Sequence, residues 1–441
     1  MIHTHDTIHI IGGGLAGCEA AWQVARAGLK AVLYEMRPAR STEAHKTDQL
    51  AELVCSNSLK SEGENSAPWL LKEELRRLHS LLIGDIAPRV RVPAGHALTV
   101  DRELFAAEVT RMLEAEPLIE IRREEVTKLD PDKIWIIASG PLTSDALAEE
   151  IARITGSERL FFYDSISPIV DAESIDRTIA FAESRYGKSL DGTADYINCP
   201  FNKEEYEAFL DALLEARSVP AHIEQDNVRY FEACLPVEEI ARRGRDTLRF
   251  GPMKPMGLTD PRTGRRPWAV VQLRAENARA GSYNLVGFQN HMRFPEQERV
   301  FRMIPGLQNA EFLRFGQVHR NTYINGPALL TGTLQLRANP NVFFAGQISG
   351  VEGYVESIAT GFLAGRYAAA LAQGRAITAP PRLTALGSLT AYVSGADPTH
   401  YQPANITFDL LPKLEQPPRD KKQRYAEVCR RALAALEEMR V

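Results

Sequence analysis

The stretch Thr7-Ile8-His9-Ile10-Ile11-Gly12-Gly13-Gly14-Leu15-Ala16-Gly17 decides the fold of this chain. It begins as a mostly β-branched run, and Gly12, Gly14 and Gly17 then fill the three glycine positions of a dinucleotide-binding fingerprint. The first glycine allows a tight turn, the second lets backbone approach a pyrophosphate, and the third lets a helix pack close to the strand. The sequence predicts a strand over 7–11, a cofactor-binding turn over 12–17 that includes Gly13, Leu15 and Ala16, and a helix over 16–27.

A second strand follows and ends in an acid. Gly28 stops the helix, and residues 30–35 form an apolar run that closes on Glu35. At this point of a βαβ unit, a carboxylate accepts hydrogen bonds from the ribose hydroxyls of a dinucleotide. An acid here disfavours a 2′-phosphate, so the pattern favours FAD or NAD over NADP.

Two later strands run into glycines and complete the expected sheet. Residues 134–138 lead into Ser139-Gly140-Pro141, at the strand end where an open α/β sheet holds its ligand. Far downstream, residues 341–346 repeat the pattern of a buried strand before Gly350, Gly353 and a small-residue helix over 357–372. We therefore expect a discontinuous nucleotide domain, 1–141 with 328–441, and a substrate domain inserted at 142–327.

The remaining periodicities predict the other elements. Apolar spacing indicates one helix over 69–83 and a second from Asp101 to Met112. The middle of the chain shows a helix over 203–216 and strands over 268–273 and 283–288, and a last amphipathic helix covers 420–440. The fold class is α/β, a Rossmann-like domain with a large α+β insertion domain.

Composition narrows the class of protein. The chain has 441 residues and a formal charge of −5, so a nucleic acid would be held by a local basic face. Its five cysteines, at 18, 55, 199, 234 and 429, show neither metal-ligand nor disulphide spacing, which predicts reduced thiols and no metal. Polar residues open the chain, and no signal peptide or membrane span is expected, so we expect a cytoplasmic protein.

The cysteine in Val54-Cys55-Ser56-Asn57-Ser58-Leu59 lies twenty residues beyond Glu35. A disulphide-reducing flavoenzyme needs a second cysteine close by, and here the neighbouring cysteines are Cys18 and Cys199. This placement favours a thiol that meets a substrate beside a flavin. The alternative is a small buried apolar side chain, the commoner fate of a cysteine in a cytosolic protein.

These segments resemble the folate- and FAD-dependent tRNA (uracil-5-)-methyltransferases, relatives of the GidA tRNA-modifying flavoproteins of glutathione-reductase type. The resemblance covers nearly the whole chain. It rests on residues 12–17, Glu35-Met36-Arg37-Pro38, 54–59, 92–95, Phe231-Glu232-Ala233-Cys234-Leu235-Pro236, 250–254, His319-Arg320-Asn321-Thr322-Tyr323, and 350–361. The chain departs from the family near its C-terminus, at Ala404, Thr407 and Asp409.

The resemblance implies a reaction. Enzymes of this family take a one-carbon unit from 5,10-methylenetetrahydrofolate, reduce it with FAD electrons supplied by NAD(P)H, and form 5-methyluridine at position 54 in the T-arm of tRNA. GidA has an additional C-terminal helical region for a partner protein, so no obligate protein partner is expected here.

The resemblance also implies site residues. Uracil C5 becomes nucleophilic only after a thiolate adds at C6, and a base must later remove the C5 proton. Cys234 is the expected nucleophile and Cys55 the group that handles the proton or guards the nucleophile, although the two roles could be exchanged. Lys254 and Arg320 are candidates to place positive charge near the thiol, and His319 to contact folate or phosphate. Gly140, Gly346, Gly350, Gly353 and Tyr354 are expected around the flavin.

Three other functions fit the same motifs. One is the same chemistry on a ribosomal RNA uridine, since the sequence contains no base-reading code that separates the two RNAs. Another is a flavin oxidoreductase for a small molecule, and a third is an RNA-binding flavoprotein without methyl transfer.

Overall fold

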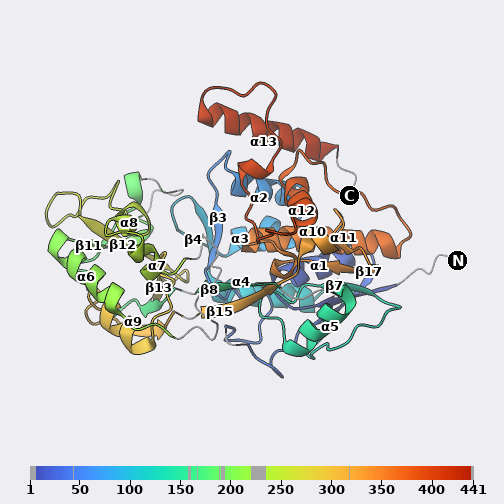
Figure 1. Cartoon of the computed structure of the whole chain (residues 1–441), viewed down its shortest axis with the longest axis horizontal. Helices are drawn as coiled ribbons and strands as arrows, with labels where there is room; N and C mark the ends of the chain where they lie inside the picture. The colour runs from blue at the N-terminus through green and yellow to red at the C-terminus, as the bar shows by residue number, and fades with distance from the viewer. Residues whose placement is uncertain are drawn as a thin grey trace.

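The protein has two lobes joined by smaller strands (Figure 1). A computed structural model describes residues 6–42, 44–156, 160–165, 167–187, 189, 194–219, 235–316 and 318–438, without the side chains of 160–165 and 318–320. The larger lobe, at the right of Figure 1, contains the first strands and the last helices of the chain. The middle of the chain forms the smaller lobe at the left.

The larger lobe is built on a six-stranded sheet with the order β16-β17-β7-β1-β2-β6. Its members are β1 (Thr7–Ile11), β2 (Lys30–Tyr34), β6 (Ile119–Arg122), β7 (Ile134–Ile137), β16 (Gln335–Leu336) and β17 (Asn339–Phe344). All neighbours pair in parallel except β16 with β17. Strand β17 pairs with β7, which confirms that sequence from both ends of the chain completes the nucleotide-binding sheet.

Two helices pack tightly against each other on this sheet, α1 (Leu15–Arg26) and α11 (Tyr354–Ala372). Small residues allow the approach. A Cβ added to Gly361 of α11 would lie 2.2 Å from the Ala16 carbonyl oxygen, and one added to Gly365 would lie 2.5 Å from that of Ala20. The contact fixes the C-terminal half of the chain directly over the fingerprint turn.

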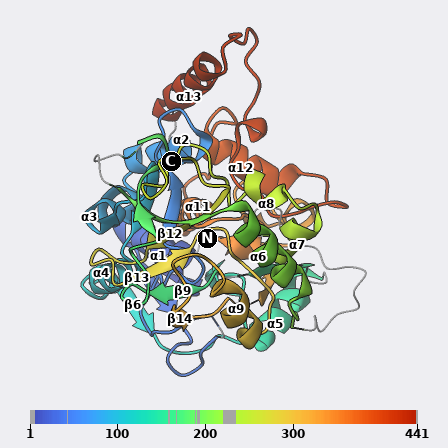
Figure 2. The ribbon, with the colours of Figure 1, turned by 90° about the vertical axis from the view of Figure 1, so that its left-hand side faces the viewer.

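The smaller lobe contains a second six-stranded sheet, with the order β10-β11-β12-β13-β9-β14. Its strands are β9 (Ile169–Asp171), β10 (Phe181–Ala182), β11 (Tyr196–Phe201), β12 (Ala269–Ala275), β13 (Ser282–Leu285) and β14 (Phe312–Arg314). Helices α6 (Lys203–Glu215), α7 (Val237–Arg242), α8 (Thr247–Phe250) and α9 (Phe294–Phe301) belong to the same lobe, and α6 and α9 face the viewer in Figure 2. The predicted α+β character of the middle segment is confirmed.

Two small sheets lie between the lobes. One is β3-β5-β4 (Ser58–Ser61, Ala97–Val100 and Arg91–Val92), and the other pairs β15 (Val318–Tyr323) with β8 (Leu160–Ser165). The sequence predicted helices in this part of the chain, and the three-stranded sheet was not expected. Strand β3 follows the Cys55 segment directly, and Asn57 of that segment donates a hydrogen bond to the Ala275 carbonyl oxygen of β12, so the segment lies where the two lobes meet.

The remaining helices surround the larger lobe. They are α4 (Arg102–Glu114), α5 (Asp145–Thr155), α10 (Gly326–Leu329), α12 (Ala385–Gly395) and α13 (Lys421–Glu437). None of the described helices is long and apolar enough to cross a bilayer. The division at 141/142 and 327/328 remains our proposal. It agrees with the origin of the first sheet from 7–137 and 335–344, and of the second from 169–314.

The single helix expected over 69–83 is wrong. The structure has α2 (Ala67–Arg77), a reversal at His79 with φ +63°, a π-helical turn (Leu81–Ile86) and α3 (Ala87–Arg89). The cause is the buried Glu19 of α1. Its carboxylate accepts hydrogen bonds from the Leu81 and Leu82 N–H groups at 3.1 and 3.0 Å. A carboxylate that satisfies these N–H groups starts a new helix where the apolar spacing suggested continuation.

Gly361→Ala should destabilise the protein, because its methyl group would overlap the Ala16 carbonyl and force α11 away from α1. We expect the free energy of unfolding to fall by about 1–3 kcal/mol. Urea denaturation followed by circular dichroism measures it. Gly395→Ala, also in a helix but with no heavy atom within 4 Å of the added carbon, is the matched control. Equal stabilities for the two variants would contradict the packing argument.

Candidate functional site

A large pocket opens where β1, β2 and β7 end, with about 1040 Å³ of empty space including its mouth. The predicted cofactor residues that line it are Gly12, Gly14, Leu15, Ala16, Glu35, Gly140, Gly346 and Tyr354. The pocket therefore brings together residues from 12 to 354, as expected of a site completed by both ends of the chain.

The fingerprint turn forms a cradle for an anion. Helix α1 has Gly14 as its N-cap, without a side-chain cap and without an acid in its first turn, so its first N–H groups face the pocket. A Cβ at Gly14 would meet no heavy atom within 4 Å, which leaves room for a phosphate. Gly12 has φ +105°, and its Cβ would lie 2.4 Å from the Ala138 carbonyl oxygen. The turn thus has the space and the donors that a pyrophosphate requires.

Gly13 and Gly17 act on the backbone side of the same turn. The Gly13 N–H donates to Glu35 Oε2 at 3.0 Å. A Cβ on Gly17 would lie 1.9 Å from the Gly12 carbonyl oxygen, so the third glycine permits the close packing of helix and turn. Neither residue lies in the pocket wall.

Glu35 ends the second strand and is held by a buried arginine. Arg37 Nε lies 2.9 Å from Glu35 Oε1, and both side chains are almost fully buried. Burial opposes ionisation, but the hydrogen bond and charge of Arg37 hold the pKa of Glu35 below its ordinary value. Glu35 therefore remains an acceptor-only carboxylate, suited to a ribose diol and not to a phosphate.

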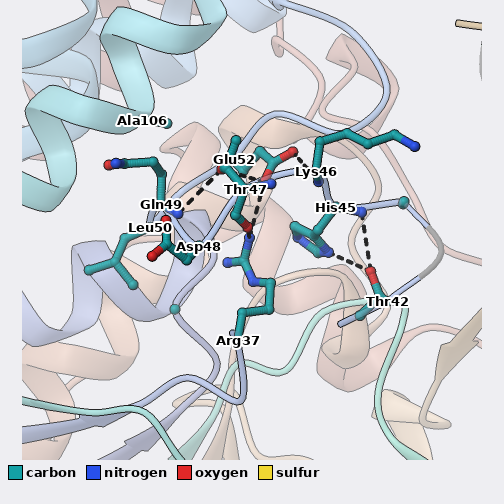
Figure 3. Close-up of polar contacts among 12 residues, drawn as sticks. Arg37, Thr42, His45, Lys46, Thr47, Asp48, Gln49, Leu50, Glu52 and Ala106 are labelled. Carbon is teal, nitrogen blue, oxygen red and sulfur yellow. Dashed lines mark hydrogen bonds and ion pairs between the residues drawn. The ribbon is translucent and has the colours of Figure 1, made fainter. Parts of the chain in front are cut away.

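The loop after Arg37 closes one side of the pocket (Figure 3). Glu52 accepts hydrogen bonds from the N–H groups of Lys46 and Thr47, at 2.8 and 3.1 Å, and from Arg37 Nη1 at 3.1 Å. Arg37 thus joins two carboxylates, and a Glu35–Arg37–Glu52 network fixes the loop. Arg37 belongs to the Glu35-Met36-Arg37-Pro38 motif, but no local pattern in the sequence predicts its role or that of Glu52.

His45 is a second residue that the sequence analysis missed. It lines the pocket, and its Nδ1 lies 2.6 Å from Thr42 Oγ1. Burial and the charge of Arg37 lower the pKa of His45 to about 4. A neutral imidazole therefore faces the pocket at physiological pH, which avoids a further positive charge beside Arg37.

A second pocket adjoins the first and contains the thiol. It has about 780 Å³ of empty space and is lined by Cys55, Ser56, Lys60, Asn321 and Glu352. It shares six wall residues with the first pocket: Val54, Pro141, Leu142, Gln347, Tyr354 and Ser357. A dinucleotide in the first pocket would therefore extend toward Cys55.

Tyr354 joins the two pockets. Its phenol oxygen accepts the N–H groups of Cys55 and Ser56, at 2.8 and 3.1 Å. Burial, followed by the charge of Cys55, raises the pKa of Tyr354. The phenol thus remains protonated and fixes the Cys55 backbone from a helix that begins almost 300 residues later in the chain.

The C-terminal tail reaches the same pocket. Lys60 Nζ lies 2.6 Å from Glu356 Oε1 and also donates to Asn405 Oδ1. Glu356 is fully buried in the first turn of α11, and its Oε1 also accepts the Ile406 N–H at 2.9 Å. The Lys60–Glu356–Asn405 group therefore connects the β3 segment, α11 and the tail.

Five predicted residues are placed elsewhere or are not, or not fully, described. Gly350 packs against Tyr401, and neither pocket includes it in its wall. Lys254 is exposed on the smaller lobe and also lines neither pocket. Cys234 lies outside the described residues. The backbones of His319 and Arg320 belong to β15, which leads to Asn321 in the Cys55 pocket, but their side chains are not described.

The other described cysteines belong to the core. Cys18, Cys199 and Cys429 are at most 1% exposed. Burial raises the pKa of all three thiols, and it raises that of Cys199 and Cys429 to about 12. No group of three potential metal-ligating side chains occurs in the part of the chain that the structure covers.

Comparisons with known proteins agree with this geometry. Residues 7–376 match the family model of glucose inhibited division protein A. The chain is 73% identical over 438 residues to the methylenetetrahydrofolate–tRNA-(uracil-5-)-methyltransferase TrmFO of Solibacter usitatus, covering 98% of both chains. It is 66% identical to the protein of that name from Koribacter versatilis, over 97% of this chain and 96% of the relative. It is 57% identical to that from Geobacter sulfurreducens, over 98% of each.

The fold has a close counterpart among solved structures. GidA from Aquifex aeolicus, in its form II crystal, superposes with a TM-score of 0.69 at 14% identity. The alignment covers 98% of this chain and 73% of that one. This similarity confirms the predicted fold class.

Glu35→Gln should weaken binding of the expected FAD, because the amide loses the negative charge that Arg37 requires and one acceptor for the ribose. We expect at least about a tenfold rise in the dissociation constant, measured by quenching of flavin fluorescence on titration into apoprotein. Glu120→Gln, at the exposed ion pair of the neighbouring strand β6, is the control and should leave the affinity unchanged. Wild-type affinity in Glu35→Gln would disprove the assigned role of this carboxylate.

Proposed function

The chain belongs to the glucose inhibited division protein A family and, within it, to the methylenetetrahydrofolate–tRNA-(uracil-5-)-methyltransferases, and we propose from this premise how its residues carry out the reaction. The reaction moves a one-carbon unit from methylenetetrahydrofolate to C5 of a uracil in tRNA. Our assignment of the site rests on the wall residues that the dinucleotide pocket and the Cys55 pocket share.

FAD fits the first pocket. The open Gly14 cradle at the start of α1 suits the pyrophosphate, and Glu35 suits the adenosine ribose. Gly346 and Tyr354 line this pocket, and Tyr354 also lines the Cys55 pocket, so the isoalloxazine ring would reach Cys55 past Tyr354. When bound, FAD supplies the hydride that reduces the transferred carbon to a methyl group.

The two cysteines have different roles in the reaction at the uracil ring. Cys234 Sγ adds to C6, and its electron pair makes C5 nucleophilic toward the methylene carbon. Cys55 then takes the proton from C5, and the electron pair of that bond passes into the ring and expels the nitrogen that carried the one-carbon unit, which leaves a methylene group on C5. When that methylene group is reduced to methyl, its electron pair re-forms the C5–C6 double bond and expels the Cys234 thiolate from C6. Support for Cys55 comes from its place in the pocket and its fixed backbone.

The proposal also includes the co-substrate, the target uridine and the residues that contact folate or RNA. NAD(P)H supplies the reducing electrons, and the substrate uridine is that at position 54 in the T-arm. His319, Arg320 and Lys254 remain proposed contacts for folate or RNA. Their support is the position of β15 beside the Cys55 pocket and the exposure of Lys254.

Purified protein with bound FAD should transfer label from [¹⁴C]methylenetetrahydrofolate to an unmodified tRNA transcript when NADPH is present. We expect the label at position 54 and its loss from a transcript with cytidine there. Cys234→Ala and Cys55→Ala should each lower the rate by at least about 10²-fold with FAD still bound.

Cys429→Ala is the control for removal of a thiol, since this cysteine packs in α13 and should leave the rate unchanged. Label at another tRNA position would contradict the proposed T-arm target. Full activity in Cys55→Ala would contradict its role as the base.

A further inference from the structure

Three arginines from three elements surround the Cys55 turn. Arg102, the first residue of α4, donates through Nη1 to the Leu53 carbonyl oxygen. Arg274 of β12 donates through Nη2 to Ser56 Oγ at 2.7 Å and through Nε to Asn57 Oδ1 at 3.0 Å. Guanidinium groups therefore hold the chain on both sides of Cys55, through the Leu53 carbonyl oxygen on one side and through the Ser56 and Asn57 side chains on the other.

The third arginine lies at the end of β14. Arg314 is half-buried, and its Nη2 makes only a long contact, 3.5 Å, with the Ala44 carbonyl oxygen at the edge of the Cys55 pocket. Its Nε is buried and has no hydrogen-bond partner among the described residues. The few hydrogen bonds of this guanidinium do not explain its position by the stability of the fold alone.

Positive charge exceeds negative charge around this thiol. Glu276 pairs with Arg102 at 2.6 Å, and Glu352 in the pocket wall accepts a hydrogen bond from Gln347. The Lys60–Glu356 pair is neutral as a whole. Among the described residues, two carboxylates thus stand against the three guanidiniums. The phenols of Tyr354 and Tyr196 do not offset the excess, because burial raises the pKa of each.

The arginines interact electrostatically with Cys55 itself. Burial lowers the pKa of Arg274 and Arg314, and the charge of Cys55 opposes that shift. Burial also acts against Arg102, but the charge of Glu276, with a smaller contribution from Cys55, raises the pKa of this guanidinium. Such coupling is reciprocal, so the guanidiniums favour the ionised form of the thiol. The core cysteines lack such a surrounding, and burial raises the pKa of their thiols.

We propose that Arg102, Arg274 and Arg314 are positioning residues that keep the Cys55 side chain a thiolate before substrates bind. This inference rests on the role of Cys55 in the proposed function, where a sulphur must accept the proton from C5. A thiolate does so directly: the S–H bond forms, the C5–H bond breaks, and its electron pair passes into the ring. A neutral thiol would first have to lose its own proton.

Alkylation tests the proposal without RNA or folate. The FAD-bound enzyme is treated with iodoacetamide from pH 5 to 9, and mass spectrometry follows the peptide that contains Cys55. Only the thiolate reacts, so the rate reports its fraction. We expect the wild-type rate to reach its plateau below pH 7, whereas an ordinary thiol titrates near pH ~8.5.

Arg314→Gln is the main variant, because Arg314 has the fewest structural contacts of the three. We expect its alkylation rate at pH 5, the acid end of the range, to fall about tenfold, as for a rise of one pKa unit, while the plateau at high pH stays unchanged. Arg314→Lys should restore most of the rate. Arg274→Gln and Arg274→Lys should behave in the same way, if FAD absorbance shows that the site is intact. Arg111→Gln, on the exposed face of α4, is the control for loss of one charge.

Two results would overturn the inference. One is a wild-type Cys55 that reacts only as pH passes 8. The other is an Arg314→Gln enzyme whose pH profile matches that of the wild type. Since neither measurement involves methyl transfer, failure here leaves the labelling test intact. Conversely, if the tRNA stays unlabelled while Cys55 is a thiolate, the proposed function is refuted, but the effect of the three arginines on Cys55 is not.

Discussion

The close approach of α11 to α1 is the constraint on which the site depends. The Cβ positions of Gly361 and Gly365 lie against the carbonyl oxygens of Ala16 and Ala20, so larger side chains at these positions would separate the helices. Because α11 begins at Tyr354, the same packing that completes the core also places this phenol beside Cys55. A dinucleotide site formed by the first 140 residues alone would lack the wall that directs it to the thiol.

The three arginines meet at Cys55 because the two lobes are joined there. Asn57 is fully buried and donates through Nδ2 to the carbonyl oxygens of Val100 and Ala275, at 3.2 and 2.9 Å, while its Oδ1 accepts from Arg274. One asparagine thus ties β5, in the small sheet between the lobes, to β12 of the smaller lobe, beside the thiol. Burying three guanidiniums against two carboxylates costs stability, and proteins accept such a cost mainly at functional sites.

The parts of the fold that were predicted correctly are those that a local pattern in the sequence determines. The βαβ unit around Gly12 and Glu35 and the late strand that ends before Gly346 were found from apolar runs and glycines, and their geometry agrees. The break at His79 was missed because its cause, Glu19, is 60 residues away and on another helix. Arg274 and Asn57 are 217 residues apart, and no periodicity links them. A pattern of apolar residues shows which face of a helix or strand is buried. It does not show which distant polar group forms hydrogen bonds with that helix or strand.

The departure of the tail from its family pattern at Ala404 has a physical explanation. The contacts of Ala404 are made by its backbone: its carbonyl oxygen accepts the Glu352 N–H at 3.0 Å, and its N–H donates to the Gly350 carbonyl oxygen at 3.4 Å. Any side chain that fits the space preserves them. Asn405, by contrast, contacts Lys60 through its own oxygen, and Lys60 pairs with the buried Glu356 at the pocket wall. The tail therefore connects to the thiol pocket through the Asn405 side chain and the backbone of Ala404, and the Ala404 side chain takes no part in these hydrogen bonds.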